Sequence, residues 1–297
     1  MSDSSKLQVS SFKSLPSAAR GLERGACSLQ LRARRTRALG VTLLEMIMVI
    51  VITGIIGTAI AFFIRRPVES YIDAVRRAEL TDIADTALRR ITRDLRTALP
   101  NSVRVDGTGK YIEYLQTSGG GRYRAEPDSG GLGEALDFTI ADTLFDVIGP
   151  VPVFAAGDQI VIYNLGPGSG ATDAYTGGNR TAFASVAPPT VTIAAKQFPF
   201  ASPGKRFQVV QYPVTYACEA GVLRRYWGYP IAAAQPVPPV GGTSALLATN
   251  VNNASCNFSY AAGGATQRTG VVSLTLQISL GGESVRIFQQ VHVSNVP

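Results

Sequence analysis

The longest apolar stretch of the chain lies near its start. Residues 41–64 read VTLLEMIMVIVITGIIGTAIAFFI, and Glu45 is their single charged residue. At about 1.5 Å per residue, a helix of this length crosses a hydrocarbon layer of roughly 30 Å. The pattern therefore predicts a membrane-spanning helix over residues 41–66.

A second helical pattern follows directly. From Val68 to Leu99, apolar residues recur three or four positions apart, with Asp and Arg between them. Pro100 supplies the stop, because its ring cannot continue a helix. We expect residues 67–100 to extend the first helix as an amphipathic half, with Pro67 as a point where the axis can kink.

Residues 101–297 change to short alternating runs separated by Gly, Pro, Asn and Ser, which predict strands and no further helix of note. The clearest signal is residues 273–280 followed by Gly281-Gly282 and residues 283–293, a β-hairpin with a two-residue turn. Further strands are expected at Val103–Val105, Tyr111–Gln116, Ala135–Ile140, Gln159–Leu165, Arg206–Tyr212, Val214–Cys218 and Val222–Tyr229. The expected fold class is α+β, with an antiparallel sheet packed on the C-terminal half of the long helix.

Two glycine-rich stretches, residues 118–121 and 166–170, could be mistaken for phosphate-binding loops. Neither carries the Lys-Ser/Thr partner of such a loop, and neither leads into a helix. We expect both to be surface turns.

The net charge of +7 is concentrated at the start of the chain. Residues 1–40 carry eight Lys or Arg and two acidic side chains, so the remaining 257 residues have a net charge of +1. A body this close to neutral has no field that attracts phosphate, and nucleic acid is not an expected partner. Arg32, Arg34, Arg35 and Arg37 stand just before the apolar helix and predict a cytoplasmic N-terminus, with the head on the other side of the membrane.

The few cysteines and the single histidine limit the kinds of catalytic and metal site that we expect. Of the three cysteines, Cys27 lies in the basic segment, which leaves Cys218 and Cys256 as a pair. Their spacing favours a disulfide in an oxidising compartment over a metal site, and two free buried thiols are the alternative. His292 is the only histidine and falls among the polar positions of its strand, so we expect no catalytic triad, no metal site and no cofactor.

Glu45 is the anomaly of the apolar run. An unpaired carboxylate inside a bilayer is costly, and such residues are functional candidates by default. The alternative is an interfacial acid that lies near the positive end of the helix dipole and reaches the headgroups.

The surrounding residues, Arg37-Ala38-Leu39-Gly40 followed by Val41-Thr42-Leu43-Leu44-Glu45, resemble the prepilin peptidase motif of type IV pilins and of type II secretion pseudopilins. The resemblance implies removal of residues 1–40 by a cut between Gly40 and Val41, and methylation of the Val41 amine. It also implies that Glu45 pairs with the terminal amine of a neighbouring subunit during assembly. Val41 stands where the family usually has Phe.

A competing processing site is Ala59-Ile60-Ala61, which fits ordinary signal peptidase and would release a soluble periplasmic protein. The apolar run continues past that site through Phe62, Phe63 and Ile64, which disfavours the cut.

A narrower resemblance covers both ends of the body. The chain is similar to the MshO-like minor pilins of mannose-sensitive haemagglutinin (MSHA) type pili in two regions. The first is residues 65–104, which include Arg76-Arg77-Ala78-Glu79-Leu80. The second is the tail, from Phe207 to Cys218, around Cys256 and from Val291 to Pro297. Residues 105–205 carry little that matches.

This resemblance implies a structural subunit, not an enzyme, that helps to prime or cap a type IV pilus. It would be held in the bacterial inner membrane before it enters the pilus. The implied partners are prepilin peptidase, other major and minor pilins, the inner-membrane assembly platform and the lipid bilayer. A minor pseudopilin of a type II secretion system is the alternative, and a signal-anchored periplasmic enzyme is a third, for which the sequence offers no paired catalytic acids.

Overall fold

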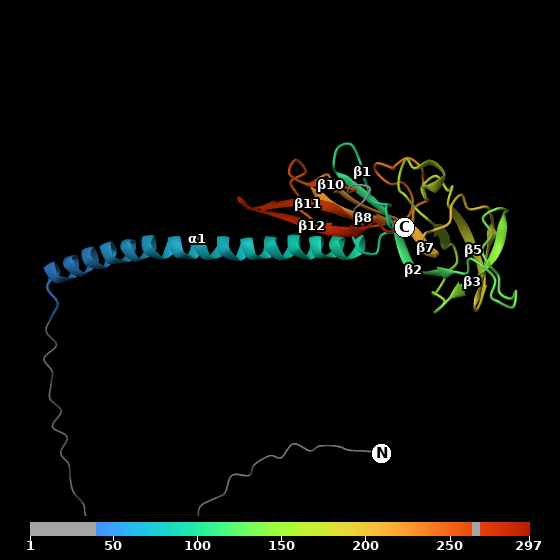
Figure 1. Ribbon diagram of the computed structural model, residues 1–297. Helices are drawn as coiled ribbons and strands as arrows, with labels where there is room; N and C mark the ends of the chain where they lie inside the picture. Colours follow the sequence, from blue (N-terminus) through green and yellow to red (C-terminus); the bar gives the residue numbers. More distant parts are fainter. Residues whose placement is uncertain (1–39, 263–267) are drawn as a thin grey trace, which may run out of the picture. The chain divides into compact units, whose positions relative to one another are not determined.

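The computed structural model describes residues 40–262 and 268–297. It contains a long helix, α1 (Leu43–Leu95), and a 3-10 turn, η1 (Gly170–Thr172), together with twelve strands (Figure 1). The strands are β1 (Arg104–Val105), β2 (Tyr111–Tyr123), β3 (Asp142–Ile148), β4 (Gln159–Ile162), β5 (Arg180–Ala187), β6 (Thr190–Lys196), β7 (Arg206–Glu219), β8 (Val222–Trp227), β9 (Thr243–Ala248), β10 (Asn257–Ala261), β11 (Thr269–Leu280) and β12 (Glu283–Ser294). The chain divides into two units, residues 1–60 and 61–297, which are described separately.

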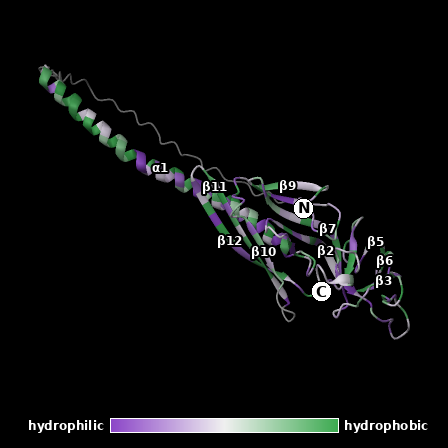
Figure 2. Cartoon of the chain, turned by 90° about the horizontal axis from the view of Figure 1, so that it is seen from above, coloured by the Kyte–Doolittle hydropathy of each residue, from purple (hydrophilic) through white to green (hydrophobic). Residues whose placement is uncertain are grey.

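In the first unit, α1 exposes an apolar surface. Every residue from Gly40 to Ile60 is exposed, and hydrophobic residues dominate this part of the helix (Figure 2). A window of 18 residues within α1 has a mean hydropathy of 2.7, and no part of that window is buried. The helix is thus long and apolar enough to anchor the chain in a membrane, as the sequence predicts.

In the second unit, one face of α1 is buried. The buried residues recur at helical spacing, and they are Leu80, Ala84, Ala87, Leu88, Ile91 and Leu95. They form one core with apolar residues of β2, β7, β11 and β12, and α1 lies alongside β11 and β12 (Figure 1). This confirms the predicted amphipathic half, and α1 passes through Pro67 without ending.

The helix ends four residues before the predicted Leu99. Ala98 N donates to Leu95 O at 3.3 Å, which tightens the last turn, and Leu99 N donates to Leu115 O at 2.8 Å. Thr117 N of β2 also donates to Thr97 O at 3.1 Å, so backbone groups freed at the helix end find partners in the sheet.

All strand pairings are antiparallel. A nine-stranded sheet has the order β1-β2-β3-β6-β5-β4-β7-β8-β9, with β2 also paired to β7, and a three-stranded sheet has the order β10-β11-β12. Two expected strands, Arg206–Tyr212 and Val214–Cys218, are one continuous strand, β7, which runs through the buried Pro213.

The predicted hairpin of β11 and β12 is confirmed. Leu280 faces Glu283 across the turn, and Gly281 and Gly282 have φ values of 61° and 89°, the left-handed conformation that such a two-residue turn requires. Leu274, Leu276 and Ile278 are buried, whereas His292 is exposed, as the alternation predicts.

Two expectations are wrong. Residues 135–140 form no strand, because the Asp137 carboxylate accepts bonds from Thr139 N at 2.7 Å and Thr139 Oγ1 at 2.6 Å and so turns the chain. Residues 118–121 are not a surface turn but part of β2, where Gly119, Gly120 and Gly121 pair with β7. Strands β3, β5, β6, β9 and β10 were not predicted from the sequence.

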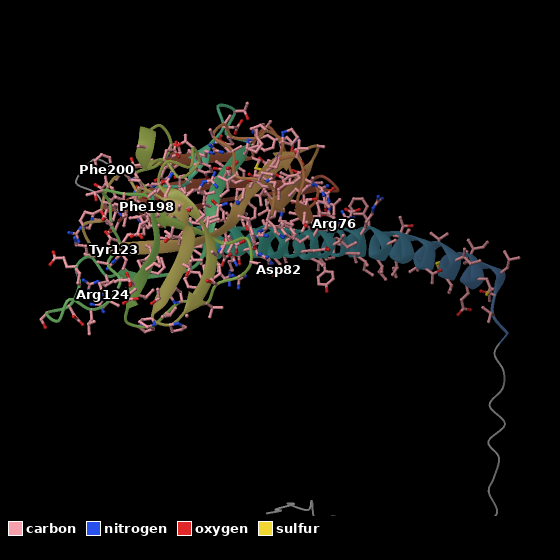
Figure 3. The ribbon with its side chains drawn as sticks, turned by 90° about the vertical axis from the view of Figure 1, so that its right-hand side faces the viewer. Arg76, Asp82, Tyr123, Arg124, Phe198 and Phe200 are labelled. Atoms are coloured by element: carbon pink, nitrogen blue, oxygen red, sulfur yellow. A yellow bond between two sulfur atoms is a disulfide. The ribbon has the colours of Figure 1, made fainter. Side chains whose placement is uncertain are left out.

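A second, aromatic core fills the part of the head formed by β3 to β6. It contains Tyr123, Phe145, Phe198 and Phe207, all fully buried. Tyr123 and Phe198 lie at the end of this unit opposite to Arg76 on α1 (Figure 3).

Candidate functional site

The start of α1 has a defined cap. Thr42 precedes the first helical residue, Leu43, and its Oγ1 accepts a hydrogen bond of 3.2 Å from the backbone N–H of Glu45. Met46 N donates to Thr42 O at 3.1 Å, which closes the first turn. Thr42 is therefore the N-cap and Glu45 the third helical residue, the arrangement of one half of a capping box. The Thr-x-x-Glu spacing in the sequence could have revealed this cap.

The cap leaves the Gly40–Val41 peptide outside the helix. Both residues are exposed, Val41 at 61%, and no other atom lies within 4 Å of the position that a Gly40 Cβ would occupy. The two residues beside the predicted cleavage position are thus both exposed and outside the helix.

The Glu45 carboxylate has no cationic partner among the described residues. Among residues 40–262 and 268–297, no Lys or Arg forms an ion pair with this carboxylate. It lies in the first turn, where the free N–H groups of the helix favour a negative charge.

Cys218, near the end of β7, and Cys256, just before β10, are joined by a disulfide, with their Cα atoms 6.3 Å apart. The predicted pairing is thus present. Next to it, Lys110 Nζ donates to the carbonyl oxygens of Asn253 and Cys256, and Cys218 N donates to Lys110 O at 3.0 Å. The bridge and the lysine together fasten the segment before β10 to the large sheet.

A buried charge pair lies in the large sheet. Glu113 is fully buried on β2, and its Oε1 accepts a 2.8 Å bond from Nη2 of Arg104 on β1. Burial raises the pKa of Glu113 to about 7, although Arg104 opposes the shift. The Arg104 guanidinium lies 3.6 Å from the centroid of the Tyr175 ring and also donates to Ala232 O and Ala233 O.

Perturbed carboxyl groups often mark functional sites. The groups around Glu113 hold the fold together. The Tyr229 hydroxyl lies 2.6 Å from Thr215 Oγ1, and Arg104 donates to a carbonyl oxygen of the loop after β8. Because Glu113 is fully buried in the folded sheet, its ionisation bears on the stability of the fold.

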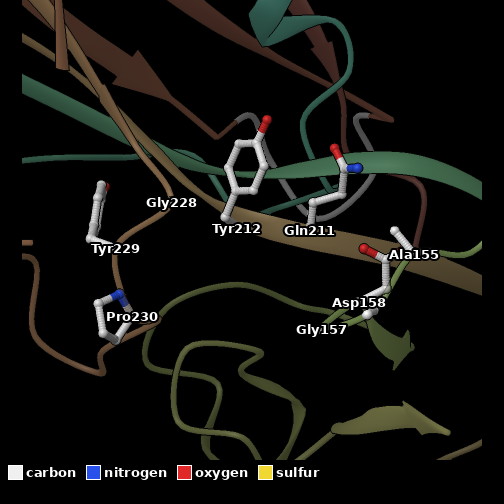
Figure 4. A pocket seen from close by; sticks show the side chains of 9 residues that line it. Ala155, Gly157, Asp158, Gln211, Tyr212, Gly228, Tyr229 and Pro230 are labelled. Carbon is white, nitrogen blue, oxygen red and sulfur yellow. The ribbon is translucent and has the colours of Figure 1, made fainter. Parts of the chain in front are cut away.

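One surface pocket of about 440 Å³ lies between the loop before β4, strand β7 and the turn after β8 (Figure 4). It is lined by Ala155, Ala156, Gly157, Asp158, Gln211, Tyr212, Gly228, Tyr229 and Pro230. Oδ2 of the buried Asp158 already accepts a 2.8 Å bond from Ala155 N, and the Tyr229 hydroxyl is engaged with Thr215. These polar groups hold the loop and the turn in place.

In the part of the chain that the structure describes, no group of three or more His, Cys, Asp or Glu side chains is arranged to hold a metal ion. Comparisons with known protein families, with curated proteins and with solved structures found no match to this chain.

Proposed function

We propose that this protein is a minor-pilin-like structural subunit that primes or caps an MSHA-type type IV pilus. The observation that carries the proposal is the helix α1. Its exposed apolar first part begins at a capped turn with Glu45, and its second part packs on an antiparallel sheet. Before assembly the apolar part would reside in the inner membrane, with the basic residues 1–40 in the cytoplasm and the head in the periplasm.

Processing would begin at the exposed Gly40–Val41 peptide. Hydrolysis by prepilin peptidase releases residues 1–40 and leaves an amine on Val41, which then becomes methylated. Removal of the leader takes away the eight basic side chains that hold the N-terminus at the cytoplasmic surface. The mature chain would begin at Val41, two residues before the first helical residue, Leu43, so its terminal amine can reach an apolar surface.

Assembly would exchange lipid around α1 for the helices of other subunits. A buried carboxylate and a buried amine are each unfavourable alone, and each offsets the desolvation of the other when they pair. Glu45 has no internal partner within the described residues, which supports a pairing with the Val41-type amine of a neighbouring pilin. The disulfide fits an oxidising periplasm.

Co-expression of the full chain with a prepilin peptidase tests the processing step. Intact-mass measurement of the membrane fraction should show a protein that starts at a methylated Val41. An uncut chain, or a soluble product that starts at Phe62, would overturn the proposal.

Incorporation can be tested separately with two glutamates of the same helix. Glu45→Ala should still be cleaved but should be strongly depleted from sheared pili. Glu69→Ala is the matched control, because Glu69 is an exposed acid of α1 whose pair with Arg65 at 2.9 Å is also exposed. Normal piliation by the Glu45 variant would contradict the pairing, and recovery with secretion pseudopilins in place of pilins would replace the pilus assignment.

A further inference from the structure

Two arginines lie directly opposite each other in the large sheet. Arg122 on β2 pairs in register with Arg206 on β7, so both side chains leave the same face with Cβ atoms about 4.5–5.5 Å apart. Both are exposed. Like charges at such positions destabilise a sheet, so a fold that keeps them calls for an explanation.

Neither arginine has an acidic partner among the described residues. Throughout residues 40–262 and 268–297, no carboxylate lies within 4 Å of either guanidinium. The next arginine on the chain, Arg124, does have an acidic partner, because its Nε lies 3.5 Å from Asp146 Oδ2. The two charges are therefore available to an external anion.

The arginines border a cleft of about 540 Å³. Its lining is completed by Gly120, Gly121, Gln208, Ile148 and Pro150. Gly120 leaves room beside Gln208, because a Cβ on Gly120 would lie 2.5 Å from Gln208 Oε1. The Gln208 side chain makes no hydrogen bond to another described residue, so an amide donor and acceptor stand beside the two guanidinium groups.

We propose that this cleft binds the carboxylate or sulfate group of an acidic saccharide. Two guanidinium groups suit one planar or tetrahedral oxyanion, and the Gln208 amide can bond ring hydroxyls. Ile148 is 48% exposed and with Pro150 gives the apolar wall against which a sugar ring can pack. The volume is well above that of a single inorganic anion, and it lies in the range of small-ligand pockets.

Other occupants fit the cleft less well. A single-stranded nucleic acid would need aromatic platforms for its bases, and the lining contains none. An acidic peptide added as a strand would need a free sheet edge, but Arg122 is already paired on both sides, with Ile148 of β3 and with Arg206 of β7. Pro150 and Pro152 have no N–H to offer a strand.

The test uses the purified full chain in non-ionic detergent and does not depend on pilus assembly. Titration calorimetry with sialyllactose and with a heparin-derived tetrasaccharide should show binding to at least one of them, and neutral lactose should not bind. Arg122→Gln with Arg206→Gln should weaken binding about tenfold or more. The matched control, Arg96→Gln with Arg286→Gln, removes the same charge from two exposed unpaired arginines and should stay within about twofold.

Circular dichroism of both double variants confirms that each is folded. Absence of binding to either acidic saccharide, equal binding of lactose, or unchanged affinity in the Arg122 and Arg206 variant would each overturn the proposal. It would also fail if inorganic sulfate, an oligoglutamate peptide or a DNA duplex bound the arginine pair more tightly than the saccharides.

Discussion

Arg225 on β8 donates a hydrogen bond from Nε to Oδ2 of Asp94, in the last turn of α1, at 3.0 Å. The same carboxylate oxygen accepts a 2.6 Å bond from the hydroxyl of the fully buried Tyr216, and burial raises the pKa of that tyrosine. The Arg225 guanidinium also lies 4.8 Å from the centroid of the Trp227 ring. One carboxylate thus fastens the end of the helix to two neighbouring strands.

Asp94→Ala should destabilise the head by about 2–4 kcal/mol, because it leaves Arg225 and the Tyr216 hydroxyl without their shared acceptor in a largely buried place. Urea unfolding of the full chain in detergent measures the change. Trp227 is the only tryptophan of the chain, so its fluorescence reports on this junction.

Asp85→Ala is the control for that prediction. Asp85 also pairs with an arginine of α1, Arg89, at 2.7 Å, but the two side chains are 40% and 75% exposed. Its loss should cost less than about 1 kcal/mol. Equal effects of the two variants would show that the Asp94 contacts do not fasten the helix.

The sequence predicts the helix and the last hairpin well because their signals are local. The apolar run and the spacing from Leu80 to Leu95 define α1, and Gly281-Gly282 defines the turn between β11 and β12. The boundary at Leu95 escaped prediction because it depends on the bond from Leu99 to Leu115, a partner in another element. Residues 118–121 read as a loop because only the pairing with β7 makes a strand of so many glycines.

The residues of the candidate sites also differ in whether the sequence could reveal them. Gly40, Val41 and Glu45 are contiguous in sequence, so a motif could identify them, and Cys218 and Cys256 are the two cysteines that remain outside the basic leader. The pairs Arg122 with Arg206 and Asp94 with Arg225 join residues far apart in the chain. No periodicity or spacing predicts such contacts, since they follow from sheet register and helix packing.

Thiol counting tests the disulfide and the leader together. The denatured, unreduced full chain should react with one maleimide, at Cys27, and the reduced chain with three. After removal of residues 1–40 the counts should become zero and two. Mass spectrometry reads both numbers, and a count of two reactive thiols before reduction of the processed protein would rule out the Cys218–Cys256 bond.

Gly166→Ala should destabilise the head more than Gly168→Ala. Both glycines have a positive φ, 100° and 82°, so both variants carry backbone strain. A Cβ at Gly166 would lie 2.7 Å from the carbonyl oxygen of Asn101, in the connection that follows α1, whereas no atom lies within 4 Å of a Cβ at Gly168. Thermal unfolding of the two variants isolates this contact, and equal losses would show that the Gly166 loop does not press on Asn101.

Glu113 should make the stability of the head depend on pH. Its pKa is raised from 4.5 to about 7 by burial, so the folded state holds a proton that the unfolded state releases. The stabilisation is therefore complete below pH 4.5 and is lost as the pH rises to about 7, a change of about 3 kcal/mol at most. Urea unfolding at several pH values, followed by Trp227 fluorescence, measures it.

Glu113→Gln keeps the shape of the side chain and removes the titration. The variant should match the parent protein at acid pH, lack the decline, and exceed the parent in stability at alkaline pH, because the neutral amide avoids the cost of a buried charge. Glu79→Gln, at an exposed position of α1, should give a curve parallel to that of the parent. A Glu113 variant that is less stable than the parent at alkaline pH would show instead that the ionised pair with Arg104, at 2.8 Å, outweighs the burial of Glu113.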